Sequence, residues 1–450
     1  MTTSTPRRGD AHAGRKPGTV ALASYIGTTI EWYDFFIYGI AATLVFRTQF
    51  FPEFSETAGT LASLGTFAVG FIARPIGGIV MGHFGDRVGR KSMLVVSLLM
   101  MGIATTLIGF LPTFEIIGIW APILLIVLRL IQGAGVGGEW AGAVLMAVEN
   151  APPKRRSLYG CFPQLGLPSG ILLSQLAFLL ITGVMSPDAF TAWGWRIAFL
   201  SSSLLIIVGL VIRLAIEESL DFEKVRDSGK VEKLPVIEVF KTSALQILIG
   251  SLASVAAPAI GYLVSVYMVS YGTATLNIPT TTMLWILIGV SVAWIMMMLA
   301  SALSGDRFGR KITFAVGAGV GVLWAFPLFW LVDSVSIPLI AVALIGITAA
   351  NSIMAGPQPA LITEMFPIRL RYSGASISYT IASVLGGGIT PLLATALFAE
   401  FGTSMAVSVL IATVCLISLI AILSASNRVL FAKEPAQEPS AAAQAATESS

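Results

Sequence analysis

Charged residues are scarce in this sequence of 450 residues: they make up 11% of the chain, whereas 56% of the residues are hydrophobic. In ordinary soluble domains, about a quarter of the residues are charged. A soluble fold of this length does not form with so few charges, and the mean hydropathy of +0.86 points the same way. We therefore expect an all-α polytopic membrane protein, which has the lipid bilayer as a partner and binds no nucleic acid.

Cysteine and histidine are also rare, with two residues of each. Cys161 and Cys415 fall in apolar segments, where inert buried thiols are expected rather than a disulfide framework or a metal site. His12 lies in a polar tail and His83 in a loop, so neither is expected to act inside the membrane. No nucleotide-binding loop, metal-ligand cluster or Ser/His pair is recognisable. We therefore expect no enzyme, no cofactor and no bound metal.

Twelve apolar segments have lengths suited to membrane helices. We place them at about 20–46, 58–81, 92–111, 119–150, 158–183, 195–214, 242–272, 280–303, 312–332, 338–364, 373–399 and 403–426. Residues 1–19 and 428–450 are polar and are expected to be disordered tails. Residues 215–241 are mixed in charge and are expected to link a six-helix bundle at 20–214 to a second bundle at 242–427.

Basic residues are concentrated in every second predicted loop. These loops carry Arg87, Arg90, Lys91, Lys154, Arg155, Arg156, Lys224, Arg226, Lys230, Lys233, Arg307, Arg310, Lys311, Arg369 and Arg371. The alternate loops carry Arg47, Arg196 and almost no other base. Lys and Arg are enriched in cytoplasmic loops of membrane proteins. We therefore expect both termini to be cytoplasmic and the chain to reside in a bacterial cytoplasmic membrane.

Two motifs occur twice, at corresponding places in the two halves. GHFGDRVGRK at residues 82–91 returns as ALSGDRFGRK at 302–311, in each case between the second and third helices of a half. ENAPPKRR at 149–156 is echoed by EMFPIRLR at 364–371, at the end of the fourth helix. The chain is therefore interpreted as a duplicated six-helix unit, an architecture in which transporters bind substrate between two halves.

These motifs carry a resemblance to a known family. The loop at 82–91 resembles the signature loop of the major facilitator superfamily. Further segments are similar to its metabolite:proton symporter family, namely EWYDF at 31–35, ARPIGG at 73–78, RLIQGAGVGGE at 129–139, ENAPPKRR at 149–156 and WGWR at 193–196. That family includes carriers of shikimate, citrate, α-ketoglutarate, proline and betaine, and the resemblance covers all twelve helices. It implies two pseudo-symmetric halves that import a small organic acid or zwitterion together with protons, and we expect a monomer.

Five charged residues fall within the predicted membrane segments: the acids Glu31, Asp34 and Glu139 and the bases Arg74 and Arg129. An ionised group there costs about 2.5–3.5 kcal/mol or more, so such residues mark functional sites by default. Three acids cannot each pair with one of two bases, so one acid is expected to be neutral at ordinary pH. A proton-coupled carrier requires such a group. We predict that Glu31, Asp34, Arg129 and Glu139 couple protons; a satisfied ion pair between helices is the structural alternative.

The predicted internal ion pair joins Asp34 to Arg129. In the superfamily the fourth helix packs beside the first, and the pair matches, by resemblance, the acid and arginine of proton-coupled sugar carriers. Arg74 is then left to face the cavity, where its planar guanidinium suits a substrate carboxylate; a bridge to Glu31 is its alternative role. The neutral residues predicted to bind substrate are Tyr38, Gln132, Tyr262, Tyr267, Asn351 and Gln358.

The repeated loops also predict two cytoplasmic gate clusters. Asp86 can cap the helix that follows it and can pair with Arg90, which in turn can reach Glu149. The second half repeats these positions as Asp306, Arg310 and Glu364. We expect both clusters to hold the cytoplasmic ends together in the outward-open state and to break when the protein opens inward. A static loop that only sets topology is the alternative.

Two other functions fit a twelve-helix membrane protein. One is efflux by proton antiport, but the helix at 158–183 reads Gly166-Leu-Pro168-Ser-Gly170 rather than the fuller Gly-Pro-x-x-Gly-Gly run of such exporters. The other is a receptor derived from a transporter, but the tails and the linker contain no recognisable signalling domain. We therefore favour proton-coupled import.

Overall fold

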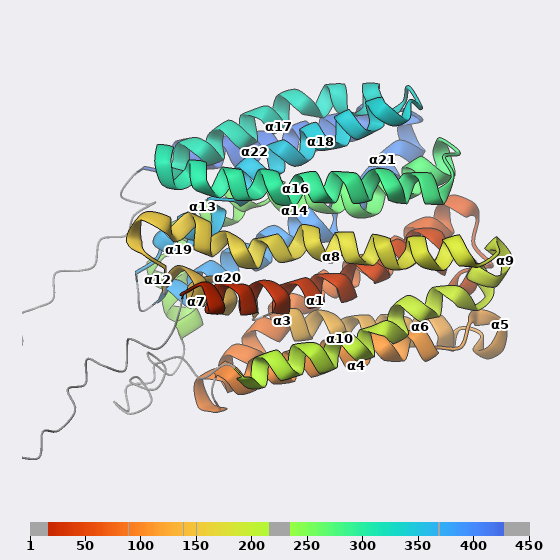
Figure 1. Cartoon of the computed structure of the whole chain (residues 1–450), viewed down its shortest axis with the longest axis horizontal. Helices are drawn as coiled ribbons and strands as arrows, with labels where there is room; N and C mark the ends of the chain where they lie inside the picture. The colour runs from red at the N-terminus through yellow and green to blue at the C-terminus, as the bar shows by residue number, and fades with distance from the viewer. Residues whose placement is uncertain are drawn as a thin grey trace, which may run out of the picture.

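The computed structural model describes residues 17–88, 90–137, 139–149, 151–215, 235–367 and 370–426. The regular structure in these ranges is helical, and the long helices run side by side along the longest dimension of the molecule (Figure 1). The predicted tail at residues 1–16, the linker residues 216–234 and the tail at residues 427–450 lie outside the described ranges.

Six membrane-spanning segments form the first half of the chain. They are α1 (Pro17–Leu44), α3 (Glu56–Val88), α4 (Arg90–Phe110), α6 (Trp120–Val136) continued by α7 (Glu139–Glu149), α8 (Arg156–Val184) and α10 (Trp195–Ala215). The connections contain α2 (Phe46–Phe50), α5 (Phe114–Ile117), the 3₁₀-helix η2 (Pro153–Arg155), α9 (Pro187–Ala189) and the π-helix η3 (Phe190–Gly194). We call the end of the molecule that contains α9 the α9 end.

The second half has the same order. The segments are α13 (Ala244–Ser254) with α14 (Ala256–Tyr262), η4 (Leu263–Tyr267), α15 (Met268–Ser270) and η5 (Tyr271–Thr275); α16 (Thr280–Phe308); α17 (Arg310–Val332); α18 (Ile337–Ala355) with α19 (Gln358–Glu364); α20 (Arg371–Ala382) with η7 (Ser383–Gly388) and α21 (Thr390–Phe401); and α22 (Met405–Ser424). A short helix, α12 (Pro235–Thr242), precedes them, and we call its end of the molecule the α12 end (Figure 1). The predicted all-α fold of two six-helix halves is confirmed.

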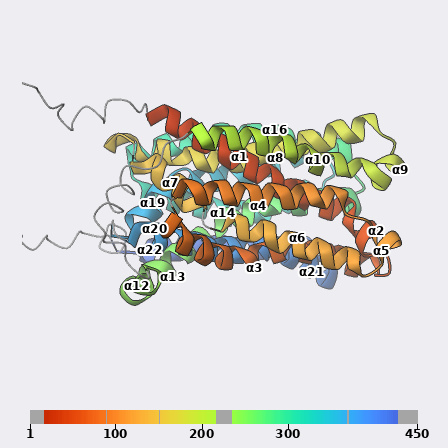
Figure 2. The same cartoon turned by 90° about the horizontal axis from the view of Figure 1, so that it is seen from below.

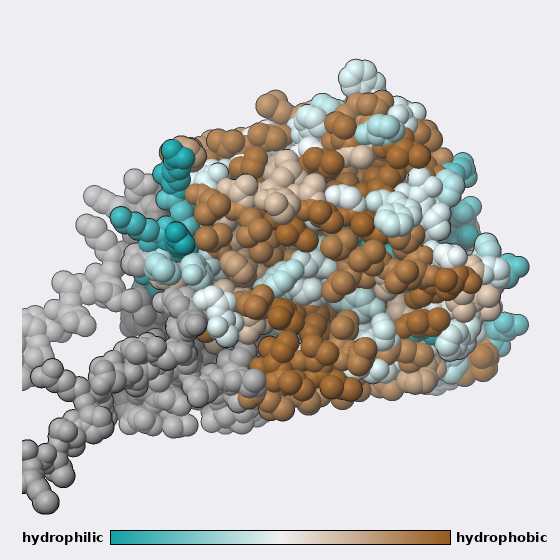
Figure 3. All heavy atoms as spheres, in the orientation of Figure 1, coloured by the Kyte–Doolittle hydropathy of each residue, from teal (hydrophilic) through white to brown (hydrophobic). Residues whose placement is uncertain are grey.

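The helices have the length and apolar surface that a bilayer requires. Nine helices within the described ranges are long and apolar enough to cross a membrane, and Val95–Phe110 and Trp120–Val136 are apolar but shorter. On the face shown in Figure 3, hydrophobic residues cover the middle of the helices and hydrophilic residues gather toward the two ends. This distribution is the one expected for a helix bundle whose middle part is surrounded by the hydrocarbon core of a bilayer.

The two halves meet along several helices. The main lateral contact is between α8 and α16, which lie side by side in Figure 1. Helix α3 packs on η7, and α1 packs on η4. The segments η4 and η7 are π-helical, a geometry that occurs frequently at functional sites. Figure 2 shows from below that the long helices of both halves run along the same dimension, with α9 at one end and α12 at the other. The π-helical segments therefore lie where the two halves meet.

Glycines bring α3 and α6 into backbone contact. A Cβ atom at Gly77 would lie 1.9 Å from the main-chain oxygen of Ala134, and one at Gly133 would lie 2.0 Å from that of Gly70. Small residues at helix interfaces permit this close approach in membrane proteins. Because α3 carries Arg74 and α6 carries Arg129, the contact holds both buried arginines within the first half.

Candidate functional site

A small cavity of about 30 Å³ lies between the two halves, at mid-length of α1 and α3. It has room for about one water molecule. The first half contributes Thr28, Glu31, Trp32, Arg74, Val136, Gly137 and Trp140, and the second half contributes Ser376, Tyr379, Thr380 and Ser383. Residues that carry a guanidinium, a carboxylate and hydroxyl groups therefore border one space that both halves form.

Arg74 is the base of this cavity. Its side chain is buried, and Nη1 donates a 2.7 Å hydrogen bond to Oγ of Ser383 in the other half. Its Cζ atom lies 4.4 Å from the ring centroid of Phe71 and 4.6 Å from that of Phe35. Within the part of the chain that the structure describes, its Nε and Nη2 groups have no hydrogen-bond partner. Because a buried unpartnered donor is costly, these two N–H groups are suited to a ligand that supplies oxygens.

A stacked aromatic pair closes the cavity toward the α12 end. The rings of Trp140 and Tyr379 belong to different halves, and they lie parallel within 4° with centroids 3.8 Å apart. Nε1 of Trp140 donates to Oε1 of Gln164 at 2.8 Å, and Nε2 of Gln164 donates to Oε1 of Gln358 at 3.4 Å. This layer of rings and amides therefore joins the halves directly beside the cavity.

A second aromatic cluster closes the cavity toward the α9 end. Tyr262 of the second half is fully buried, and its ring lies 5.0 Å from that of Phe71 and 5.7 Å from those of Phe35 and Phe67. The ring of Trp32, which lines the cavity, lies 6.2 Å from Tyr262. Aromatic side chains from both halves therefore lie on both sides of the cavity.

A separate polar group lies deeper in the first half. Asp34 is fully buried, and its Oδ1 atom accepts a hydrogen bond from Oγ of Ser202, whereas Oδ2 has no hydrogen-bond partner among the described residues. The guanidinium of Arg129 is also fully buried, with Cζ 4.0 Å from the ring centroid of Phe35 and 4.2 Å from that of Tyr38.

The predicted ion pair between Asp34 and Arg129 is wrong for this conformation, because the guanidinium donates to Gln132 and the carboxylate accepts from Ser202 instead. The amide oxygen of Gln132 accepts from Nη1 of Arg129, and its amide nitrogen donates to the main-chain oxygen of Asp34 at 3.2 Å. The third acid, Glu139, accepts a 3.1 Å hydrogen bond from Oγ of Ser97.

Several residues predicted to bind substrate make contacts within their own half. Tyr38 donates to Oγ1 of Thr66 at 2.6 Å, and Asn351 donates to the main-chain oxygen of Ala257 at 2.5 Å. Tyr267 stacks on another tyrosine of its own half, with centroids 5.6 Å apart. The residues predicted to bind substrate or couple protons that line the cavity are Glu31 and Arg74.

Several cavity residues were missed by the sequence reasoning. Trp32 and Trp140 each directly follow an acid of the predicted proton set, and this adjacency could have drawn attention to them. Tyr379 and Ser383 lie four residues apart, so they share one face of their helical segment. Nothing in the spacing shows that this face meets Arg74, because the contact depends on how the halves pack.

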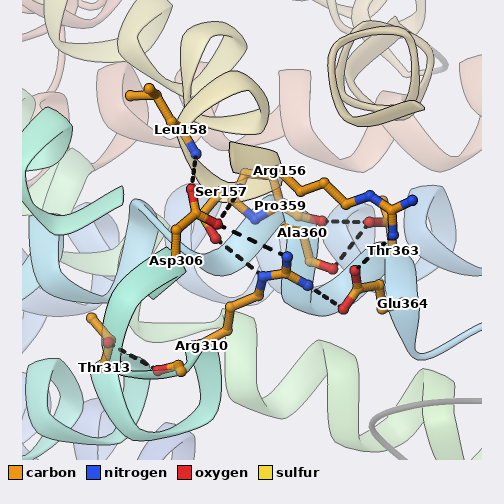
Figure 4. A network of polar contacts seen from close by, with 11 residues as sticks. Arg156, Ser157, Leu158, Asp306, Arg310, Thr313, Pro359, Ala360, Thr363 and Glu364 are labelled. Atoms are coloured by element: carbon orange, nitrogen blue, oxygen red, sulfur yellow. Dashed lines mark hydrogen bonds and ion pairs between the residues drawn. The ribbon is translucent and has the colours of Figure 1, made fainter. Parts of the chain in front are cut away.

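A second set of contacts joins the halves at the α12 end (Figure 4). The carboxylate of Asp306 accepts hydrogen bonds from the main-chain N–H groups of Ser157 (2.9 Å) and Leu158 (3.0 Å), at the start of α8. A carboxylate at a helix N-terminus is favoured by the free N–H groups and by the helix dipole. The second-half loop therefore binds directly to a first-half helix.

The same set of contacts contains two arginines. Arg310 forms an ion pair with Glu364, lies 4.0 Å from Asp306, and donates to Oγ of Ser157 at 3.1 Å. Arg156 of the first half lies 3.5 Å from the carboxylate of Glu364. We call these residues the interhalf cluster, consisting of Arg156, Ser157, Leu158, Asp306, Arg310 and Glu364. The structure thus brings the predicted second-half trio together, and the trio also reaches across to the first half.

The corresponding first-half trio cannot be compared in the same way. The side chains of Asp86, Arg90 and Glu149 lie outside the described part of the chain. Their predicted cluster therefore stays a prediction.

Comparison with known proteins identifies similar sequences over most of the chain. A sequence profile of the Major Facilitator Superfamily matches residues 24–391. The inner membrane metabolite transport protein YhjE of Escherichia coli K12 is 42% identical over 410 residues, covering 90% of this chain and 93% of that protein. The shikimate transporter of the same strain is 41% identical over 407 residues, covering 88% and 92%. Its proline/betaine transporter is 32% identical over 384 residues, covering 83% and 76%.

Solved structures show a likeness in fold. The crystal structure of a D-xylose-proton symporter superposes with a TM-score of 0.69 at 20% identity, covering 90% of this chain and 96% of that chain. The proton:xylose symporter XylE bound to 6-bromo-6-deoxy-D-glucose gives a TM-score of 0.73 at 20% identity, covering 90% and 94%. At this level of identity the likeness concerns the fold alone.

Proposed function

Because the chain belongs to the major facilitator superfamily and is a membrane transporter rather than an enzyme, we propose that it is a proton-coupled symporter. The proposed cargo is a small metabolite that carries a carboxylate, imported by alternating access of the two halves. The similarity to metabolite, shikimate and proline/betaine transporters supports a cargo of this size. The observation that carries the proposal is the cavity between the halves, where Arg74 keeps two unpartnered N–H groups.

The chemistry of the cavity favours an anionic group on the cargo. A guanidinium presents N–H groups in a fixed plane that matches the two oxygens of a carboxylate. The hydroxyl groups of Thr28, Ser376 and Thr380 border the same space and suit further polar groups of the cargo. A cavity of about 30 Å³ is smaller than any such metabolite, so we propose that the stack of Trp140 on Tyr379 opens when cargo is bound or released.

We assign the α12 end to the cytoplasm and the chain to a bacterial inner membrane. The described residues of the α12 end include the bases Lys154, Arg155 and Lys311, whereas the α9 end has Arg47 and Arg196. This asymmetry supports cytoplasmic termini under the positive-inside rule. In this assignment the bundles at 20–214 and 242–427 are the moving halves, and residues 215–241 are their cytoplasmic linker.

Proton coupling is proposed for the acids of the first half, with Asp34 as the carrier. Asp34 combines complete burial with one carboxylate oxygen that has no hydrogen-bond partner, a setting that favours the neutral form. Glu31 lies one helical turn away and lines the cavity, and Glu139 and Arg129 complete the proposed coupling set. A group that is neutral when enclosed and ionised when it is hydrated or paired can carry a proton across with the cargo.

The proposed function is tested by uptake into proteoliposomes. The panel consists of labelled shikimate, citrate, α-ketoglutarate, proline and betaine, each measured with and without an inward proton gradient. We expect at least one carboxylate of the panel to accumulate above equilibrium only when the gradient is present. Gradient-driven exit of cargo would instead indicate antiport, and accumulation that ignores the gradient would refute proton coupling.

Loss of Asp306 should open the cytoplasmic end. Asp306→Asn keeps the size of the side chain but removes the charge that caps α8 and faces Arg310. Loss of such charge-assisted contacts should shift the conformational equilibrium toward the inward-open state by about tenfold, which corresponds to about 1.4 kcal/mol. Spin labels on the exposed positions Lys154 and Arg307, one in each half, report the change as a longer distance.

The control for this prediction is Asp188→Asn, the same substitution at an exposed position near the α9 end. It should leave the label distances unchanged. An Asp306→Asn variant that keeps the wild-type distances but prefers a different cargo would show that the interhalf cluster acts in selection rather than as a gate.

A further inference from the structure

Gln132 connects three helices of the first half through one side chain. It is fully buried on α6, three residues from Arg129, so both side chains share one helix face. Its amide oxygen accepts from Nη1 of Arg129. Its amide nitrogen donates to Oγ1 of Thr105 on α4 at 2.8 Å and to the main-chain oxygen of Asp34 on α1 at 3.2 Å. A neutral amide thus accepts from the guanidinium of Arg129 and is anchored to the main chain at Asp34.

Asp34 and Arg129, which both bond to Gln132, also have unused polar atoms. Among the described residues, Oδ2 of Asp34 has no hydrogen-bond partner, and neither do Nε and Nη2 of Arg129. The remaining contacts of this guanidinium are with ring faces, which attract a cation far less than a carboxylate does in a buried setting. The arrangement is favourable while Asp34 is neutral. An ionised Asp34 would be drawn to Arg129, because a buried charge without a partner is strongly destabilising.

We propose that Gln132 is a positioning residue that holds Arg129 away from Asp34 while Asp34 carries a proton. When Asp34 releases its proton to water, the guanidinium leaves the amide of Gln132 and pairs with the carboxylate. The inference deepens the proposed function, since it rests on Asp34 as the proton carrier.

Other polar and titratable side chains near Asp34 and Arg129 could also influence the titration of Asp34. Among the described residues, the titratable side chains that act on Asp34 or Arg129 are Glu31, Tyr33 and Tyr38 on α1, Arg74 on α3 and Tyr262 on α14. Helices α4 and α10 present the neutral hydroxyl groups of Thr105 and Ser202. Substitutions at position 132 leave all these groups in place, so they isolate the effect of the amide.

Protonation of Asp34 can be measured directly, without cargo or a gradient. In purified protein in lipid, infrared difference spectra follow the carboxyl band that is missing from Asp34→Asn. Gln132→Met removes the amide at similar length and frees Arg129, so the ionised form of Asp34 gains a partner. We expect the midpoint of the titration to fall by about one pH unit, a tenfold change in the ionisation constant.

Gln132→Glu should produce the opposite shift. A carboxylate at position 132 gives Arg129 a lasting anionic partner and places a negative charge beside Asp34. Both changes disfavour the ionised form, so the midpoint should rise by about one pH unit. The control is Gln175→Met, the same substitution at a buried glutamine on α8 that accepts from Ser291. It should leave the midpoint at the wild-type value.

A purely structural role for Gln132 predicts a different result. Both variants would then lower the melting temperature and leave the titration midpoint of Asp34 unchanged, and this result would overturn the inference. The inference would also be overturned if the wild type showed no titrating carboxyl band from Asp34. If Gln132→Met does not fold, the nearly isosteric Gln132→Glu is tested alone. An upward shift of its titration midpoint then supports the inference, and an unchanged midpoint overturns it. Shifted midpoints together with uptake that ignores the proton gradient would refute the proposed function only. Unshifted midpoints together with gradient-driven uptake would refute this inference only.

Discussion

The variant Asp34→Asn is expected to lose all uptake driven by a proton gradient, down to the level of vesicles without protein. Asparagine has the shape of the protonated acid and can still accept the hydrogen bond from Ser202, so the local packing should persist. Its amide cannot ionise, so the proposed proton carrier is fixed in the neutral form. Exchange of cargo across the membrane needs no net proton movement and should continue. The measurement compares gradient-driven uptake with exchange in the same proteoliposomes.

Two variants make this result specific. Asp188→Asn carries the same change at an exposed position and should accumulate cargo as the wild type does. Full gradient-driven uptake by Asp34→Asn would remove Asp34 from the mechanism. The proton would then have to be carried by Glu31, which lines the cavity, or by Glu139, which accepts from Ser97.

The fold was predictable because a membrane helix can be recognised from its own stretch of sequence. Each apolar run must satisfy its own backbone hydrogen bonds, so length and hydropathy alone place it as a helix. The repeated loops at 82–91 and 302–311 then established the two halves. The breaks within helices were not predictable in this way. The π-helical segment η7 depends on tight contacts such as that of Gly387, where an added Cβ would lie 2.4 Å from the ring of Tyr262.

The sequence predicted which charged residues lie in the membrane, but it did not predict which residues they contact. Burial in a membrane makes Arg74 and Glu31 conspicuous, and both line the cavity. The packing of the fourth helix beside the first in the superfamily predicted a pair of Asp34 with Arg129, but the guanidinium donates to a neutral side chain, Gln132. The spacing of residues along the sequence cannot show whether Arg129 reaches Asp34 or Gln132. That choice depends on how each helix is rotated and on the glycine contacts between α3 and α6.

The loop between α16 and α17 also shows that sequence spacing predicts contacts within a half but not contacts between halves. Spacing correctly brought Asp306, Arg310 and Glu364 together as a group. It gave no sign that Asp306 would cap α8 of the opposite half, because main-chain N–H groups at a helix start carry no sequence signal of their own. Contacts between halves are therefore the part of the site that needed a structure.

Arg74→Lys is expected to weaken cargo binding by roughly ten- to hundredfold, although the charge is conserved. Lysine supplies a point charge, whereas arginine supplies the planar pair of N–H groups that a carboxylate can bind at once. Such a charge-assisted contact contributes about 1.5–3 kcal/mol, which corresponds to that loss of affinity. Equilibrium binding of the cargo identified in the uptake panel measures the change. Arg47→Lys, at a half-buried position beside Glu56 and far from the cavity, is the matched control and should bind as the wild type does.

The alternative role of Arg74 is a structural bridge to Glu31, and a double variant separates the two roles. Arg74→Met alone should abolish binding under either reading, because it removes an anchor or leaves Glu31 without its bridge. Adding Glu31→Gln removes the charge that such a bridge would have balanced. If Arg74 binds the cargo, the double variant still lacks the guanidinium and its affinity stays at least roughly tenfold below that of the wild type. Affinity restored to the wild-type value would instead show that Arg74 serves the packing of the first half, and the carboxylate would have to be bound elsewhere.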